Sequence, residues 1–381
     1  MDFNWTEEDL AAKEAIVKFA QQNLNEEVDI ADEDYEFPRE KWQKCAAQGI
    51  QAMACGPDYG GTEQSFTRSI LLMEGLGYGC HDSGLTFGLN AQMWTVQIPL
   101  LHFGSDYIKE KYLAPMGQGL IMGAHCLTEP EAGSDVYSMQ TTAEKVDGGY
   151  ILNGHKCLIT NAPLADVAII FALTNPKLGK WGISAFVVES SSEGYNQSTR
   201  KYKMGMESIP IGDIVLKDCY VPEENILGNE GLGFSILNHS LEYDRCTILA
   251  SQLGTMQRQL ETSIAYVKNR NQFKNAVGSN QSVSNRIVDM KLRLETSRLL
   301  LYKTAWLKEN GKSTAMEVAM LKLHLSESFV SSSIDAIRNH GGIGYLKEHG
   351  IEKDLRDAMG GVIYAGTSDI QKNIIAKMLG L

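Results

Sequence analysis

The stretch from His125 to Asp135 reads His-Cys-Leu-Thr-Glu-Pro-Glu-Ala-Gly-Ser-Asp, and strand-like sequence begins here after a helical first part. The strand-like pattern stops at Pro130, and a loop of small residues follows. Gly133 has no Cβ, so a ligand can approach its backbone closely, and the Ser134 hydroxyl and nearby amide groups offer hydrogen bonds. Such a loop suits a cofactor with polar edges and phosphate groups.

A second stretch, about twenty residues further on, reads Asn153-Gly154-His155-Lys156-Cys157-Leu158-Ile159-Thr160-Asn161. Asn-Gly is typical of a hairpin turn, and Thr160 lies at the end of the strand expected to follow it. We expect the two strands to hold one planar ligand between them.

Together, in this order and spacing, the two stretches resemble the acyl-CoA dehydrogenase family of flavoproteins. Its middle domain carries a Thr-Glu-Pro-x-Ala-Gly-Ser-Asp loop followed by an Asn-Gly-x-Lys-x-x-Ile-Thr-Asn strand. The resemblance extends over nearly the whole chain. It implies an α+β fold in which an N-terminal helical domain and a C-terminal helical bundle bracket a β-barrel-like middle domain. We place these domains at residues 1–121, 122–233 and 234–381.

The pattern of apolar residues agrees with this order. Thr6 is the expected N-cap of the first helix. Apolar residues recur at helical spacing over residues 10–24, 67–78, 93–113, 251–267, 288–310 and 368–379. The middle part alternates as short strands do, with turns expected at 147–149, 153–154 and 211–213. The apolar run 165–173 predicts a buried strand, and the glycine-rich stretch 56–61 is interpreted as a connector because it lacks the Gly-Lys-Ser/Thr of a P-loop.

Composition narrows the class of protein. The chain has 381 residues, of which 43% are hydrophobic and 22% charged, so it is long enough for two or three globular domains. Its formal charge of −12 argues against nucleic acid or an anionic membrane as the main partner. The seven cysteines lack paired spacing, and the N-terminus is acidic rather than signal-like. These features predict a protein of the reducing cytoplasm.

Two other kinds of site are disfavoured. His125-Cys126 and His155-x-Cys157 carry potential metal ligands, but neighbouring residues on a strand point in different directions and no metal-binding spacing is present, so no metal is expected. No Gly-x-Gly-x-x-Gly follows a predicted strand, which disfavours a nicotinamide cofactor. FAD, which the resemblance to this flavoprotein family implies, is the expected cofactor.

The resemblance implies which residues contact FAD. Leu127 and Thr128 lie along the isoalloxazine edge, Ser134 contacts the pyrophosphate, and Leu158 and Thr160 line the ring face away from the substrate. In a homotetramer, a neighbouring subunit clasps the cofactor with an Arg-x-x-Phe, which corresponds here to Arg270 and Phe273, and Gln281 fits the family glutamine near the adenine. Gly341 and Gly342 resemble the family's glycine loop that approaches the pyrophosphate, with Arg338 where a Gln is usual. Thr367 and Asp369 are assigned to the cofactor side of the last loop.

The reaction implied is removal of a proton from the α carbon of an acyl thioester while hydride leaves the β carbon for the flavin. Many members use a Glu directly before a Gly-Thr-Ser near the C-terminus, but Ala365 stands there and offers only its backbone NH, which can bind the thioester oxygen. In the isovaleryl and long-chain branches the base precedes an Arg in the third domain. Here that residue is Asp244, one methylene shorter than Glu and followed by Arg245. Glu242 lies about 200° around the helix from Asp244 and should face elsewhere.

Two departures bear on the electron acceptor. Leu158 is smaller than the aromatic residue found in many relatives and leaves the flavin more open. His125, if protonated, would stabilise a superoxide-like species, and it is otherwise a buried, satisfied imidazole. The acceptor is thus an electron-transfer flavoprotein or O2.

The predicted function is FAD-dependent oxidation of a small acyl thioester carried on CoA or a carrier protein, with Gln92 and Trp94 as candidate residues of the pocket floor. One alternative is the prolyl-carrier-protein dehydrogenase and oxidase branch, which makes a pyrroline thioester for natural products. Another is a member without dehydrogenation chemistry, an FAD-binding scaffold or a lyase-type relative, which the loss of Glu at Ala365 favours.

Overall fold

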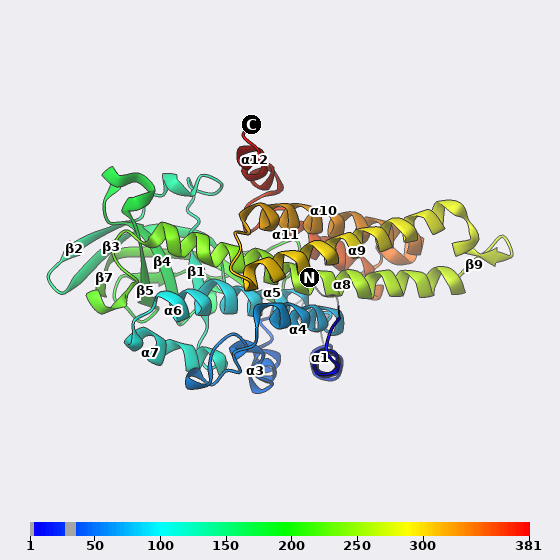
Figure 1. The fold of residues 1–381 in the computed structure, drawn as a ribbon, viewed down its shortest axis with the longest axis horizontal. Coiled ribbons are helices and arrows are strands. Elements are labelled where there is room, and N and C mark those ends of the chain that lie inside the picture. Colours follow the sequence, from blue (N-terminus) through cyan, green and yellow to red (C-terminus); the bar gives the residue numbers. More distant parts are fainter. Residues whose placement is uncertain (1–3, 27–35) are drawn as a thin grey trace.

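Helices form the first part of the chain, strands the middle and helices again the last part, as Figure 1 shows for this computed structural model. The structure describes residues 4–26 and 36–381. The strands gather at one end of an elongated molecule, and the long helices run from there to the other end (Figure 1). This order confirms the predicted α+β architecture.

The first group of helices comprises α1 (Glu7–Asn23), α3 (Arg39–Ala47), α4 (Phe66–Gly79), α5 (Ser83–Asn90), a π-helical segment (Ala91–Gln97), α6 (Ile98–Phe103) and α7 (Asp106–Gly117). Thr6 caps α1 as predicted, because its hydroxyl accepts a hydrogen bond from the Asp9 amide at 3.1 Å. The single helix expected over 93–113 is wrong. It breaks before Ser105, whose hydroxyl caps α7 by accepting from the Ile108 amide.

Eight strands form one mixed sheet: β1 (Gly123–Cys126), β2 (Thr142–Val146), β3 (Gly149–Thr160), β4 (Val167–Leu173), β5 (Ile183–Glu189), β6 (Tyr195–Gln197), β7 (Ile211–Pro222) and β8 (Ile226–Leu227). Their order is β6-β7-β3-β2-β4-β5-β8, and β1 pairs in parallel with β4. Alternate residues of β4 pack into two different cores, one shared with α7 and the other with β3 and β7. Burial on both faces explains the uninterrupted apolar run that predicted this strand.

Of the three predicted turns, one is confirmed and two are wrong. Asp147 and Gly148 make the two-residue turn between β2 and β3. Asn153 and Gly154 instead lie inside β3, where the register against β7 shifts. The Thr141 side chain occupies the space of a Cβ at Gly154, so a glycine is required by close packing rather than by a turn. The third predicted turn, 211–213, is the start of β7.

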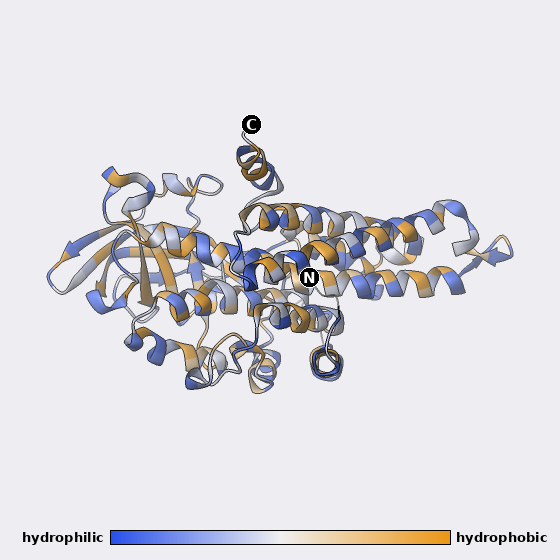
Figure 2. Cartoon of the chain, viewed as in Figure 1, coloured by the Kyte–Doolittle hydropathy of each residue, from blue (hydrophilic) through white to orange (hydrophobic). Residues whose placement is uncertain are grey.

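The C-terminal helices are α8 (Gly233–Asn269), α9 (Gln281–Glu309), α10 (Ala315–His340), α11 (Ile351–Gly361) and α12 (Ser368–Met378). Figure 2 shows hydrophobic and hydrophilic residues alternating along these helices. Their core is continuous with that of α1 and α4. A small hairpin of β9 (Asn271–Gln272) and β10 (Asn275–Ala276) projects at the far end of the bundle, and α12 stands away from it (Figure 1). In the described part of the chain, none of the helices combines the length and apolar character needed to cross a bilayer.

Candidate active site

The two stretches that resemble the flavin-binding motifs lie side by side at the ends of β1 and β3. The Cys157 amide donates to the Thr128 carbonyl at 2.9 Å, which fixes the segment after β1 against β3. Leu127 and Thr128 are both partly exposed along this contact between the segment after β1 and strand β3, here called the seam. The predicted pairing of these segments is therefore present in the fold.

A buried ion pair holds the loop beneath this seam. The Lys156 ammonium donates to Glu129 at 2.7 Å and to the Leu127 carbonyl at 3.2 Å, and both charged side chains are buried. Glu129 also accepts from the Gln140 and Thr141 amides, so it closes the loop that contains Ser134. Burial lowers the pKa of Lys156, and the neighbouring Glu129 carboxylate opposes that shift. Sequence reasoning quoted Lys156 in the motif but gave it no role.

Leu158 lies open on the surface of β3, with 57% of its area exposed. Its backbone has a positive φ of 56°, which is uncommon for a branched residue, and its amide donates to Asp213 at 3.3 Å. Thr160 lies two residues on and is partly exposed, and the adjacent Asn161 donates to the Gly123 carbonyl of β1 at 3.2 Å. The arrangement presents a small apolar residue and a hydroxyl on one surface, which fits the flat face of a flavin.

The small-residue loop after Pro130 also fits a cofactor. Gly133 and Ser134 are exposed, and a Cβ added at Gly133 would meet nothing within 4 Å. The backbone there is open for close approach by a phosphate group. The residues of this chain at the end of β1, the loop and the end of β3 thus suit FAD, which they would hold through backbone amides, hydroxyls and one apolar face.

Asp244 lies on α8 and is 4% exposed. Its Oδ1 atom is buried and has no hydrogen-bond partner among the described residues. Burial raises the pKa of Asp244 to about 7, against the opposing charges of Arg245 and Lys322. Glu242, by contrast, turns away and pairs with Lys308 at 3.0 Å. Asp244 thus has the protonation equilibrium and the unpaired oxygen of a general base for the physiological pH range.

Ala365 is brought to Asp244 by the neighbouring arginine. Arg245 donates from Nε to the Ala365 carbonyl at 2.9 Å, and Gln371 donates to the same oxygen at 3.3 Å. Ala365 has a φ of 53°, so this turn is held in a left-handed conformation. Its amide makes no hydrogen bond within the described ranges. The donor is therefore free to bind an acyl oxygen.

Of the two alternatives for His125, a protonated imidazole and a buried, satisfied one, the surroundings of the ring favour the second. His125 lies on β1 with its Nε2 3.4 Å from the Ser240 hydroxyl, and its ring centroid is 5.0 Å from that of Phe171. Burial, reinforced by the nearby charge of Lys156, lowers the pKa of His125 to about 4. The imidazole is neutral at neutral pH, so it supplies no positive charge to this site.

Gln92 and Trp94 are both buried, and both polar atoms of the Gln92 side chain form hydrogen bonds with backbone groups. Its Oε1 accepts from the Gly123 amide at 3.0 Å and its Nε2 donates to the Met116 carbonyl at 3.3 Å. Gln92 thus anchors β1 to the end of α7. Trp94 stacks parallel to Tyr243, with centroids 6.2 Å apart.

The remaining predicted residues lie elsewhere on the chain. Phe273 projects from the β9–β10 hairpin and is 93% exposed, at the end of the bundle opposite the sheet (Figure 1). Five further predicted FAD contacts are exposed and lie at or next to the ends of helices α8, α9 and α10: Arg270, Gln281, Arg338, Gly341 and Gly342. Thr367 caps α12 by accepting from the Ile370 amide at 3.3 Å, and the exposed Asp369 pairs with Lys372. One chain does not bring the hairpin to the seam of β1 and β3.

No cluster of three or more His, Cys, Asp or Glu side chains that could hold a metal ion occurs within residues 4–26 and 36–381. The seven cysteines are buried and free.

Helical domains on either side of a β domain, with an open apolar strand surface and a buried carboxylate nearby, define a flavoprotein oxidoreductase of the acyl-thioester type. The chain matches the acyl-CoA dehydrogenase N-terminal domain over residues 6–120, the middle domain over 124–219 and the C-terminal domain over 231–380. It belongs to the acyl-CoA dehydrogenase family, and FAD is its cofactor.

Individual relatives are also similar over their whole length. An L-prolyl-[peptidyl-carrier protein] dehydrogenase of Serratia sp. is 41% identical over 100% of this chain and 99% of its own. The crystal structure of the prolyl acyl carrier protein oxidase AnaB has a TM-score of 0.98 and 43% identity, covering 99% of this chain and 100% of AnaB. A structure described as PigA with FAD and proline has a TM-score of 0.98 and 41% identity, covering 100% of both chains.

Proposed function

We propose that this chain oxidises an L-prolyl group held as a thioester on a peptidyl carrier protein, with Asp244 as the catalytic base. The observation that carries the proposal is the buried, unpaired Oδ1 of Asp244, on the residue next to the arginine that holds Ala365. The fold and family establish acyl-thioester oxidation, and the similarity to relatives named for prolyl carrier proteins supports the prolyl group.

The side chains of this protein would move one proton and orient one carbonyl. Asp244 removes the proton from the α carbon, because its pKa of about 7 leaves a substantial carboxylate fraction at neutral pH while its burial keeps competing water away. The Ala365 amide binds the thioester oxygen and stabilises the negative charge that develops there. FAD, when bound, accepts the hydride that leaves the β carbon, so that a carbon–carbon double bond forms between the two carbons.

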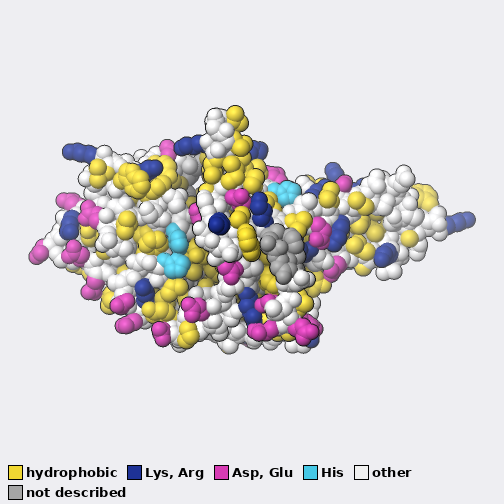
Figure 3. Space-filling model, viewed as in Figure 1, with side chains coloured by type: hydrophobic (Ala, Val, Ile, Leu, Met, Phe, Trp, Pro, Cys, Tyr) yellow, Lys and Arg dark blue, Asp and Glu magenta, His cyan; other side chains and the backbone are white. Residues whose placement is uncertain are grey.

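We also propose that several copies of the chain associate to complete the cofactor site. Phe273 is almost fully exposed, and α12 and the segments that flank it carry further exposed apolar residues: Ile363, Met378, Leu379 and Leu381. Figure 3 shows hydrophobic side chains on the projecting part of the molecule that α12 forms in Figure 1. Exposed apolar groups on projecting elements are typical of subunit contacts. A homotetramer places Arg270 and Phe273 of one chain against the FAD of another.

For the electron acceptor we propose O2, with an electron-transfer flavoprotein as the alternative. The exposed Leu158 supports this choice because it leaves the expected flavin face open to a small molecule. The neutral His125 supplies no positive charge that would favour the reaction with O2.

The direct test is anaerobic mixing of the FAD-loaded protein with a panel of thioesters. L-prolyl-carrier protein should bleach the flavin absorbance rapidly, L-prolyl-CoA more slowly and isovaleryl-CoA least. Bleaching by isovaleryl-CoA but by neither prolyl thioester would refute the prolyl assignment. The absence of bleaching by every thioester would point to a family member without dehydrogenation chemistry.

A further inference from the structure

Lys322 of α10 is a buried lysine whose charge has no direct partner. Its side chain is 1% exposed, and its Nζ atom is buried without a hydrogen-bond partner among the described residues. An isolated buried charge is unfavourable, so a lysine in such a position is usually paired or serves a function. Structural pairing does not account for Lys322.

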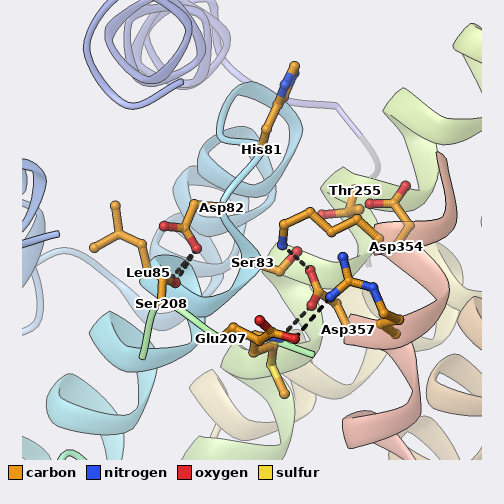
Figure 4. Close-up of polar contacts among 12 residues, drawn as sticks. His81, Asp82, Ser83, Leu85, Glu207, Ser208, Thr255, Asp354 and Asp357 are labelled. Carbon is orange, nitrogen blue, oxygen red and sulfur yellow. Dashed lines mark hydrogen bonds and ion pairs between the residues drawn. The ribbon is translucent and has the colours of Figure 1, made fainter. Parts of the chain in front are cut away.

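The two other buried lysines of the described chain are paired directly. Lys156 donates to Glu129 at 2.7 Å, and Lys353 donates to Asp357 at 2.8 Å. Asp357 lies among the polar contacts that Figure 4 shows. In both cases the ammonium group is held by a carboxylate in contact with it, whereas the ammonium of Lys322 is not.

Helices α8 and α10 pack side by side and run in the same direction (Figure 1). The side-chain amide of Gln259 on α8 forms a hydrogen bond of 3.0 Å with the Ser333 hydroxyl on α10. Seven residues earlier on each helix, Gln252 and Ser326 both lie against Gly361, where an added Cβ would be 3.2 Å from the Gln252 amide and 3.4 Å from the Ser326 Cβ. Equal steps along the two helices therefore keep facing residues level with each other.

This register brings Lys322 close to the level of the candidate base. Lys322 lies one turn before Ser326 on α10, and Asp244 lies about two turns before Gln252 on α8. The two side chains are thus separated by about one turn along the helix pair. Both are buried, and each has a charged atom without a hydrogen-bond partner in the described ranges, Nζ of Lys322 and Oδ1 of Asp244.

Each of these two groups acts on the pKa of the other. Burial raises the pKa of Asp244 to about 7, and the positive charges of Arg245 and Lys322 oppose this shift. Burial, reinforced by Arg245, lowers the pKa of Lys322 to about 8, and the carboxylates of Glu327 and Asp244 oppose that shift. Lys322 therefore stays mostly protonated at neutral pH. The other titratable groups within electrostatic range of Asp244 are Cys246 on α8 and Tyr364, the residue before Ala365.

We propose that Lys322 is a positioning residue that acts through Asp244: its ammonium stabilises the charged carboxylate across the helix pair and leaves Oδ1 free to receive the α proton. A direct ion pair would stabilise the carboxylate more strongly, but it would occupy an oxygen atom and weaken the group as a base. A positive charge that acts through space avoids both effects. The inference rests on the proposed function, because it assumes that Asp244 is the base.

The test is the pH dependence of flavin reduction by L-prolyl-carrier protein in the FAD-loaded native assembly of Lys322→Met. Methionine keeps an unbranched side chain but removes the charge, so Asp244 should need a higher pH to ionise. We expect the midpoint of the rising limb to move up by about one pH unit, so that reduction slows about tenfold below the midpoint and approaches the parental rate at about pH 9. Lys322→Arg, which keeps the charge, should retain the parental midpoint.

Lys308→Met is the matched control, because it removes one positive charge beside the same stretch of α8. Lys308 pairs with Glu242 at 3.0 Å and does not act on the pKa of Asp244. Its midpoint should stay parental. Lys322→Met replaces an unpaired buried charge by an apolar group, so its melting temperature should be at least that of the parental protein. A parental midpoint in Lys322→Met, or a lower plateau without a shift of the midpoint, would overturn the role of Lys322 without touching the proposed function.

If no thioester reduces the flavin, the proposed function fails, and the action of Lys322 on Asp244 is decided separately. The pKa of Asp244 is then measured without turnover, from the carboxyl band of pH-difference infrared spectra that is absent in Asp244→Asn. An upward shift of this pKa in Lys322→Met but not in Lys308→Met supports the inference, and an unchanged pKa in Lys322→Met refutes it.

Discussion

Arg245 donates from its Nε to the carbonyl oxygen of Ala365 at 2.9 Å, so the residue beside the candidate base also holds the turn that carries the candidate oxygen-binding amide. The two catalytic tasks are thereby joined through one side chain. A shift of this turn would misplace the thioester relative to Asp244, and a misplacement of about 1 Å can cost on the order of 100-fold in rate.

Replacing that arginine tests this link. Arg245→Lys keeps a positive charge near Asp244 but loses the planar Nε donor, so we expect the limiting rate of flavin reduction to fall by about 10- to 100-fold. FAD content should stay parental. Stopped-flow absorbance under anaerobic conditions measures the rate. An unchanged rate would show that the Ala365 turn keeps its conformation without the hydrogen bond from Arg245.

The raised pKa of Asp244 predicts a specific pH profile. Burial favours the neutral acid, and only the carboxylate accepts a proton, so activity should appear as pH rises through the pKa. Flavin reduction should increase about tenfold per pH unit below pH 7 and level off above it. A rate that is flat between pH 5 and pH 8 would mean that the base titrates well below its expected value.

The exposed Phe273 predicts that cofactor retention depends on assembly. The parental protein should be yellow, with about one FAD per chain, and should sediment as a dimer or larger. In Phe273→Ala we expect FAD to be lost on dilution to nanomolar concentration, because a neighbouring chain no longer covers it. Filtration followed by flavin fluorescence measures the released fraction. A monomer that retains FAD at that dilution would contradict the shared site.

Leu158 tests the choice of electron acceptor. Leu158→Trp places a large ring over the expected flavin face, so reoxidation of the substrate-reduced enzyme by air should slow by about tenfold or more, while reduction changes less. Double-mixing stopped-flow separates the two steps. Equal oxygen rates in the parental and variant proteins would favour an electron-transfer flavoprotein.

Sequence reasoning succeeded where a local pattern has one structural outcome. The apolar run that became β4 and the last helix α12 were both predicted, because a continuous apolar run between turns and a capped helical repeat are local signals. The motif from Thr128 to Ser134 also led to the correct family. Asn153-Gly154 was wrongly predicted to be a turn. The dipeptide lies inside strand β3, where the Thr141 side chain fills the space beside Gly154.

The rest depended on contacts between distant segments. Arg245 and Ala365 lie more than a hundred residues apart, so the hydrogen bond that joins them has no sequence signature. The anchoring role of Gln92 has no sequence signature either, because its partners, the Gly123 amide and the Met116 carbonyl, are backbone groups of other elements. The neutral His125 follows from burial, which depends on the packing of β1 against α8.

The central claim is that Asp244 takes the α proton, and the most direct test is single-turnover flavin reduction by L-prolyl-carrier protein in Asp244→Asn. This variant keeps the shape of the side chain but removes its basic oxygen. FAD content and thioester binding should be parental, while reduction slows by a factor of about a thousand or more. Asp244→Glu, measured alongside it, reports whether the shorter side chain limits the reach of the base. Reduction of the flavin in Asp244→Asn at the parental rate would contradict the account, because the proton would then be taken by another group.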